Sequence, residues 1–145
     1  MKMRHAERTD WEHYPHDADI GVRGFGEDAA EAFANAARAM TAALTPLADI
    51  SRAETVRVGC DAPDLEMLFY DWMNAVIYEM DTRRMLFADF RVQITDGRLE
   101  AELDGERVDI ARHGAAVEPK GATLSDLSVT RGADGRWTAQ CIVDV

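Results

Sequence analysis

Three titratable side chains crowd the start of a predicted strand near the beginning of the chain. From Asp19 to Phe25 apolar and polar residues alternate, which is the period of a strand with one buried face. His16, Asp17 and Asp19 come at its start, although aspartate is unfavourable in strands. Two interpretations stay open. One is a solvated turn with side-chain to backbone hydrogen bonds; the other is half of a hard-cation site, which requires another carboxylate.

Asp144 is the candidate for that second carboxylate, because it lies on the polar face of the strand predicted for residues 137–145. If this strand pairs with the strand that begins at Asp19, the two carboxylates meet at one end of a sheet. The main-chain oxygen or terminal carboxylate of Val145 would then add oxygen ligands. Ligation by oxygen alone suits calcium, magnesium or manganese rather than zinc. A bound cation would also offset the repulsion between the two acids.

Composition excludes several classes of protein. The chain has 145 residues, and its 27 acidic against 16 basic residues give a net charge of −11. Direct binding to nucleic acid needs a basic face, so this balance argues against it. Two cysteines are too few for a disulfide framework. Neither a signal peptide nor a run of roughly 20 apolar residues is present. We therefore expect a cytoplasmic protein.

The common catalytic motifs are also missing. The sequence has no Walker-type phosphate loop, no Cys-x-x-Cys and no Gly-x-Ser-x-Gly. Both cysteines, Cys60 and Cys141, fall on apolar strand faces, so we interpret them as core residues and not as nucleophiles.

Periodicity predicts the elements that would position these residues. Apolar spacings of three and four predict helices over residues 29–44 and 64–80. Alternation predicts strands, and Asp96-Gly97 and Asp104-Gly105 are typical of turns between them. The strands are expected at residues 11–14, 19–25, 54–60, 86–95, 99–103, 124–130 and 137–145, with a short one near Val117.

These elements predict an α+β fold of mostly antiparallel β-sheets with two helices packed against them. Residues 1–10 are predicted to be a flexible N-terminal segment. Residues 11–145 are predicted to form a single domain.

Taken in order, several segments of the chain resemble the archease family. The family opens with Glu-His-x-x-His-Thr-Ala-Asp-Ile/Val-Gly, which here is matched by residues 12–21. No single motif is decisive, but the set in this order is specific and extends from Trp11 to Val145. The other matching segments are residues 32–37, 70–74, 78, 81–82, 86–87, 118–123, 126–127 and 142–145.

The resemblance implies an archease-like domain that is not itself an enzyme. Archeases act on the RtcB-type RNA ligase of tRNA splicing and RNA repair, where they promote guanylylation of the ligase and its multiple turnover. RNA would be contacted only through the ligase. By position, Asp19, Asp144 and Val145 would be the metal site, with calcium implied first and magnesium or manganese as alternatives. Lys120 would match a lysine linked to activation of the partner.

Two accessory residues and two other functions stay open. Asp17 replaces the family's threonine and is either an extra ligand or a solvated side chain, whereas His16 either orients a carboxylate or makes an ordinary hydrogen bond. One competing function is a small metal-dependent phosphoesterase or hydrolase that uses Asp19, Asp144 and His16. The other is a general chaperone-like cation-binding protein.

Overall fold

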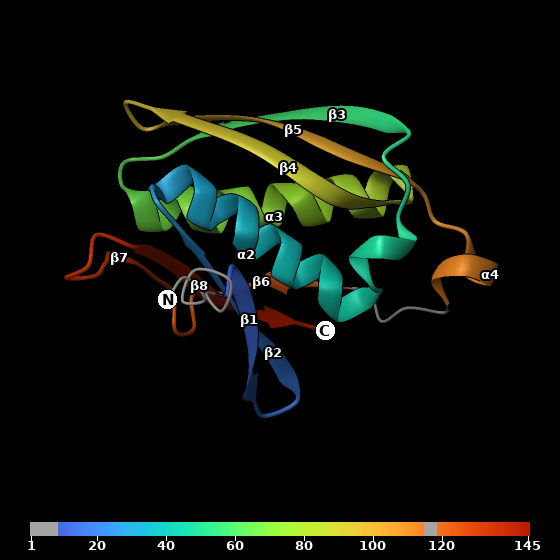
Figure 1. Cartoon of the computed structure of the whole chain (residues 1–145), viewed down its shortest axis with the longest axis horizontal. Helices are drawn as coiled ribbons and strands as arrows, with labels where there is room; N and C mark the ends of the chain where they lie inside the picture. Colours follow the sequence, from blue (N-terminus) through green and yellow to red (C-terminus); the bar gives the residue numbers. More distant parts are fainter. Residues whose placement is uncertain (1–8, 115–118) are drawn as a thin grey trace, which may run out of the picture.

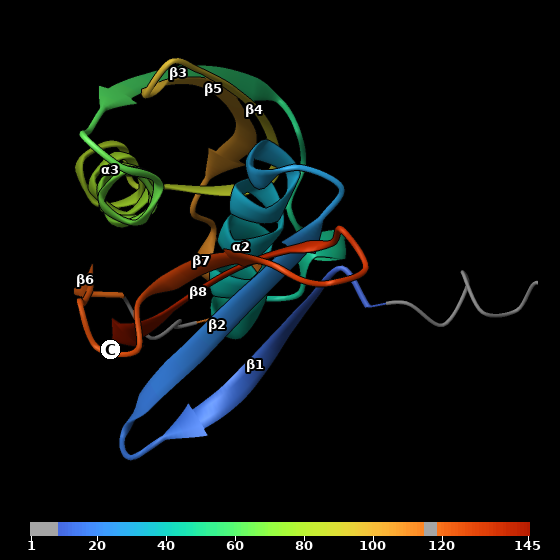
Figure 2. The ribbon, with the colours of Figure 1, turned by 90° about the vertical axis from the view of Figure 1, so that its left-hand side faces the viewer.

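Two β-sheets enclose a layer of two long helices in the computed structural model, which describes residues 9–114 and 119–145 (Figure 1). The same three layers are visible after a quarter turn (Figure 2). Five-stranded sheet A contains β1 (Trp11–His16), β2 (Asp19–Gly26), β6 (Gly121–Ala122), β7 (Ser128–Arg131) and β8 (Trp137–Asp144). Three-stranded sheet B contains β3 (Glu54–Asp61), β4 (Met85–Thr95) and β5 (Arg98–Arg107). The helices are α2 (Ala29–Leu44), α3 (Leu65–Arg83), the short α4 (Ile110–His113) and the 3-10 turn η1 (Leu47–Asp49).

The predicted α+β class is confirmed, since every strand pairing of the described residues is antiparallel and the two long helices lie between the sheets. Both helices begin at an aspartate whose carboxylate accepts from a backbone amide: Asp28 from Glu31, and Asp64 from Met67, each at 2.8 Å. Such caps satisfy amides that the first helical turn leaves unpaired. Among the described residues, no helix combines the length and the apolar character needed to cross a membrane.

The core lies between the helices and the two sheets. Trp72 of α3 is fully buried, and its indole Nε1 donates to the Phe33 carbonyl of α2 at 3.0 Å. Its ring meets Phe90 of β4 edge to face. Buried tryptophan needs such a hydrogen-bond partner, because an unpaired indole N–H would cost free energy. The side chain therefore joins α2, α3 and sheet B.

Gly24 allows α2 to lie very close to β2. A Cβ atom at this position would be only 2.2 Å from the Ala36 nitrogen and 2.3 Å from the Ala32 carbonyl oxygen. The alanine-rich face of α2 thus packs directly on the strand that begins at Asp19. This contact holds β2 in place beside β8.

The turn predicted at Asp104-Gly105 is wrong, because β5 continues through both residues to Arg107. Gly105 pairs with Glu54 and Phe87, and a Cβ atom there would lie 1.9 Å from the Leu86 carbonyl oxygen. Gly105 therefore lets β4 and β5 approach closely where their pairing is irregular, and it does not form a turn. By contrast, Asp96-Gly97 forms the expected hairpin turn.

The strand predicted over residues 124–130 is wrong at its start. β6 and β7 both pair with β8, but the residues between them form a loop. Asp126 has a φ of 55°, the left-handed conformation, which interrupts an extended strand. The short strand expected near Val117 lies outside the described residues, as do residues 1–8 of the predicted flexible segment.

A buried histidine and a carboxylate fasten the segment after β5. The His113 Nδ1 accepts from the Asp109 amide at 2.9 Å, so its Nε2 donates toward Glu106 Oε2 at 3.0 Å. Hydrogen bonds from Arg112 and then from the Ser51 amide lower the pKa of Glu106 to about 2. Because this pKa is below the ordinary value of 4.5, Glu106 stabilises the fold above pH 4.5, and this stabilisation is lost as the pH falls toward 2.

We expect Glu106→Gln to lower the melting temperature at neutral pH and to reduce its fall between pH 4.5 and pH 2. Circular dichroism melts of the two proteins across this range measure both effects. An equal fall in the variant and the unmodified protein would contradict the assignment.

Candidate functional site

Asp19 and Asp144 lie at the same end of sheet A. β2 pairs with β8 in a register that ends at Ile20 opposite Val143, and Asp19 and Asp144 are the next residues along the two strands. Because side chains alternate between the faces of a strand, both residues belong to the face opposite to that of Ile20 and Val143. The pairing on which the predicted cation site depends is therefore present. Both residues are half-buried.

His16 extends this row on the other side of Asp19. β1 and β2 form a hairpin in which His16 is opposite Asp19. β1 thus runs further than predicted, through Pro15, which an edge strand tolerates. Asp17 is exposed in the turn with a φ of 52°, a conformation that aspartate adopts more readily than most residues. Its position favours the solvated interpretation over an additional ligand.

Lys120 reaches the same sheet end from the other direction. Its backbone amide donates to the Asp144 carbonyl at 2.8 Å, and its side chain is exposed. The next residue, Gly121, is opposite Asp144 in the β6–β8 register. Segments from three distant parts of the sequence, which carry Asp19, Lys120 and Asp144, therefore meet at one place.

Asn74 of α3 holds the Lys120 segment against β8. Its Oδ1 accepts from the Ala122 amide at 2.9 Å, and its Nδ2 donates toward the Ala122 carbonyl at 3.4 Å. The Asn74 amide thus makes the two hydrogen bonds that a neighbouring strand would make to Ala122 at the unpaired edge of β6. This strand has only two residues. Residues 70–74 supported only a family resemblance in the sequence. The supporting role of Asn74 depends on a contact with residue 122 that no local pattern reveals.

The carboxylates of Asp19 and Asp144 have no ion-pair partner in the described part of the chain. Nor do those residues contain a group of three or more His, Cys, Asp and Glu side chains arranged to hold a metal ion. The two carboxylates and a main-chain oxygen of Val145 are all oxygen donors, the ligand type that a hard cation such as calcium prefers.

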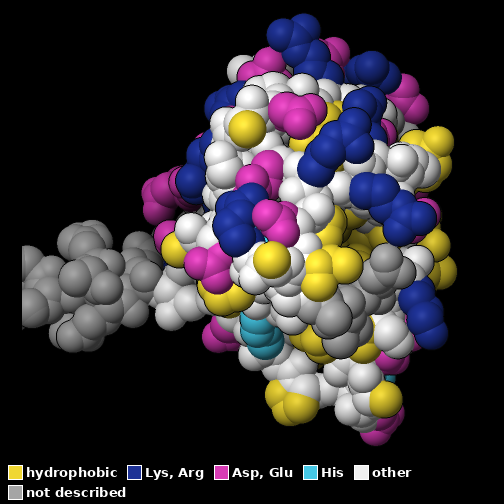
Figure 3. Space-filling view, turned by 90° about the vertical axis from the view of Figure 1, so that its right-hand side faces the viewer, with side chains coloured by type: hydrophobic (Ala, Val, Ile, Leu, Met, Phe, Trp, Pro, Cys, Tyr) yellow, Lys and Arg dark blue, Asp and Glu magenta, His cyan; other side chains and the backbone are white. Residues whose placement is uncertain are grey.

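Charged side chains of both signs lie on one face of the molecule. On the face seen in Figure 3, basic side chains gather over the upper part, interleaved with acidic ones, while the lowest tip carries hydrophobic and acidic side chains. The β1–β2 hairpin forms the bottom of the molecule in Figure 1. Asp19, the first residue of β2, follows the turn of this hairpin.

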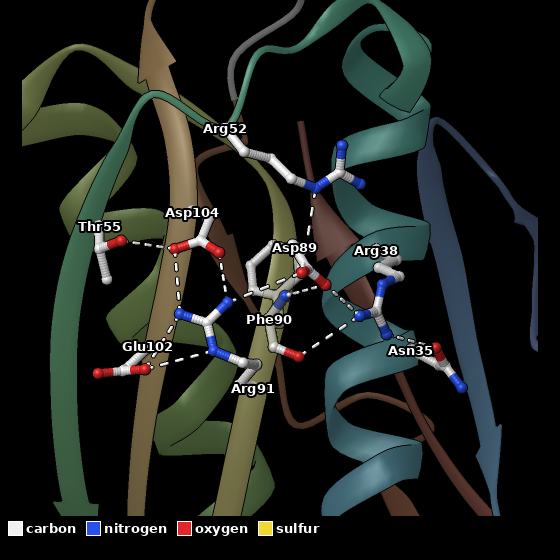
Figure 4. A network of polar contacts seen from close by, with 9 residues as sticks. All are labelled: Asn35, Arg38, Arg52, Thr55, Asp89, Phe90, Arg91, Glu102 and Asp104. Carbon is white, nitrogen blue, oxygen red and sulfur yellow. Dashed lines mark hydrogen bonds and ion pairs between the residues drawn. The ribbon is translucent and has the colours of Figure 1, made fainter.

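A hollow with a volume of about 720 Å³ lies elsewhere, on the outer face of sheet B. Its lining includes Arg57, Arg91 and Arg98. Arg91 hydrogen-bonds to Glu102 and Asp104, and Figure 4 shows that the network continues through Asp89 to α2. Neighbouring carboxylates neutralise these arginines, so the hollow is lined by a network of surface ion pairs. It is separate from the sheet end that carries Asp19 and Asp144.

Neither cysteine is activated. Burial raises the pKa of Cys60 to about 11 and that of Cys141 to about 12, so both thiols are protonated at neutral pH. The interpretation of these residues as packing residues is supported.

Comparison with known proteins gives consistent matches over almost the whole chain. The model of a family described as "Archease protein family (MTH1598/TM1083)" matches residues 11–145. "Protein archease" from Pyrococcus furiosus is 35% identical over 139 residues, which cover 93% of this chain and 98% of the relative. The Methanosarcina barkeri protein of the same name is 31% identical over 140 residues, covering 93% and 95%.

Solved structures agree with these sequence matches. The solution structure of Methanobacterium thermoautotrophicum protein 1598 superposes with a TM-score of 0.82 at 31% identity, covering 94% of this chain and 99% of that one. A crystal structure from Thermotoga maritima, described as an archease and possible chaperone, has a TM-score of 0.62 at 18% identity, with coverage of 92% and 96%. The second match supports the fold alone.

Proposed function

This chain belongs to the archease family, and on that premise we propose that it is a non-enzymatic, metal-binding activator of an RtcB-type RNA ligase. It would promote guanylylation of the ligase and its multiple turnover in tRNA splicing and RNA repair. One observation supports the proposal: the pairing of β2 with β8 brings the strand ends that carry Asp19 and Asp144 to the same end of sheet A beside Lys120, within a chain that the family matches from residue 11 to residue 145.

In this proposal the carboxylates of Asp19 and Asp144, with the main-chain oxygen of Val145, hold a divalent cation. Calcium is the first candidate, with magnesium and manganese as alternatives. When bound, the cation supplies positive charge that the two repelling carboxylates need to stay together. Asp19 and Asp144 bind it, His16 orients Asp19 from the next strand, and Lys120 faces the partner from the adjoining segment.

The acidity of the protein supports a basic partner. A net charge of −11 steers the protein toward a positively charged, metal-bearing ligase active site and speeds encounter at low salt. The sheet end with its paired acids is the part that would enter this active site. RNA would be reached only through the ligase.

The test is a time course of ligase guanylylation with GTP and with the RtcB-type ligase of the same organism. We expect the unmodified protein to accelerate guanylylation and allow many turnovers per ligase. A variant lacking residues 144 and 145 should give the rate of the ligase alone, while Asp96→Asn, in the distant β4–β5 turn, should act as the unmodified protein does. Equal acceleration by the shortened and unmodified proteins would reject the proposed site.

A hydrolase is the second candidate, because His16 lies opposite Asp19 in the β1–β2 hairpin and Asp144 belongs to the strand next to β2. Such an enzyme would turn over a phosphoester with manganese and without any ligase. A general chaperone would suppress aggregation of unrelated proteins and would tolerate Asp144→Ala. The proposed activator should do neither.

A further inference from the structure

Tyr14 crosses the outer face of sheet A next to the paired acids. It extends from β1, and its hydroxyl donates to Asp126 Oδ2 at 2.8 Å on the loop between β6 and β7. β1 and this loop lie on opposite sides of the central pair β2–β8. We call the Tyr14–Asp126 contact the strap, because it joins the two sides of the sheet over that pair.

Gly21 makes room for the strap. It is opposite Tyr14 in the hairpin, and a Cβ atom at this position would lie 2.6 Å from three atoms of the tyrosine ring. On β8, Ile142 is opposite Gly21 and only 1% exposed, although it shares the outer face with Asp144. A larger residue at position 21 would push the ring off the sheet.

The strap belongs to a closed ring of contacts. The Asp126 carbonyl accepts from Gln140 Nε2 at 3.2 Å, and Gln140 Oε1 accepts from Arg23 Nε at 2.8 Å. The Arg23 guanidinium then lies 4.3 Å from the centre of the Tyr14 ring. Asp126 takes part with a φ of 55°, and non-glycine residues held in that conformation are often found at functional sites. Four side chains thus fix one another.

Burial, followed by the hydrogen bond and charge of Asp126, raises the pKa of Tyr14. The hydroxyl therefore remains a donor throughout the neutral range, and the strap stays closed.

The strap lies one row away from the acidic site. Gly21 is two residues from Asp19, Ile142 is two residues from Asp144, and all four share the outer face. We infer that Tyr14 is a positioning residue for the proposed cation site, because its bond to Asp126 holds the β1–β2 hairpin and the β6–β7 loop against β8. Without it, repulsion between the two acids would spread the hairpin tip before a cation arrives. The inference rests on the proposed function.

The experiment compares the unmodified protein with Tyr14→Phe and Asp126→Asn, using Tyr78→Phe as a matched control at an exposed tyrosine of α3. Calcium binding is measured by calorimetric titration at neutral pH, and amide exchange over residues 123–127 reports whether the strap has opened. Loss of the hydroxyl in Tyr14→Phe should weaken calcium binding roughly threefold to tenfold and speed exchange in the loop. Asp126→Asn keeps an accepting oxygen and tolerates the left-handed φ, so it should stay within about twofold.

Faster loop exchange in Tyr14→Phe with unchanged calcium affinity would overturn the inference, because the strap would then serve stability alone. Unchanged exchange and unchanged affinity would overturn it as well. If the unmodified protein binds no calcium, magnesium or manganese, the proposed cation site fails and the positioning role fails with it. If the unmodified protein binds calcium and Tyr14→Phe binds it equally well, only the positioning role fails and the proposed cation site stands.

Discussion

Replacing Gly24 by alanine is expected to destabilise the protein by at least about 3 kcal/mol, a substantial part of the roughly 5–15 kcal/mol by which native domains are stable. The added Cβ would lie 2.2 Å from the Ala36 nitrogen and 2.3 Å from the Ala32 carbonyl oxygen. Both atoms belong to the backbone of α2, so the clash cannot be relieved by rotating a side chain. The helix would have to lift away from β2, which also carries Asp19. Urea unfolding followed by circular dichroism measures the loss.

Gly59→Ala is the matched control for this effect. Gly59 also lies within a strand, but its Cβ would meet the Arg98 Nη2 at 3.0 Å, the end of a flexible side chain on an exposed face. The change should stay within about 1 kcal/mol. Equal stability of the Gly24 and Gly59 variants would contradict the close packing of α2 on β2.

Asp144→Asn is expected to weaken binding of calcium by about 100-fold or more, and Asp19→Asn is expected to do the same. Each change would remove one of the two carboxylates that the proposed site uses as charged ligands. Isothermal titration of calcium at neutral pH measures the loss. The backbone pairing of β2 with β8 does not depend on these carboxylates, so both variants should fold.

Asp96→Asn controls for the general loss of negative charge. It removes one acid from the turn of sheet B, where asparagine tolerates the φ of 49°. Its calcium affinity should equal that of the unmodified protein. Similar losses in all three variants would show that the cation is attracted by the overall charge of the protein and not held by Asp19 and Asp144.

Local patterns were sufficient for the long elements. The apolar spacing in α2 and α3 and the alternation in β2, β3 and β8 each depend on residues close in sequence, so these elements were predicted with small errors at their ends. The same patterns could not distinguish Gly97 from Gly105. Both follow an aspartate, but one occupies a turn and the other lies against the Leu86 backbone.

The candidate site was only partly predictable. Asp19, Asp144 and Lys120 were singled out from their residue types and from the family resemblance, and the structure brings their segments together. Tyr14 and Asn74 support those segments through contacts with residues 126 and 122, which are far away in the sequence. Gly21 was the one local indication in the sequence, because a glycine within a strand often marks a place where another group packs closely on the backbone.

The pairing of β2 with β8 also has a consequence for the order of folding. Arg23 and Gln140, which face each other across this pairing, are separated by 117 positions, whereas β4 and β5 are joined by a tight hairpin. Closing so long a loop carries an entropic cost that must be met before the contacts it permits can form. We expect β3, α3, β4 and β5 to assemble early and sheet A to close last. Asp19 and Asp144 would therefore reach the same end of sheet A only in the last step of folding.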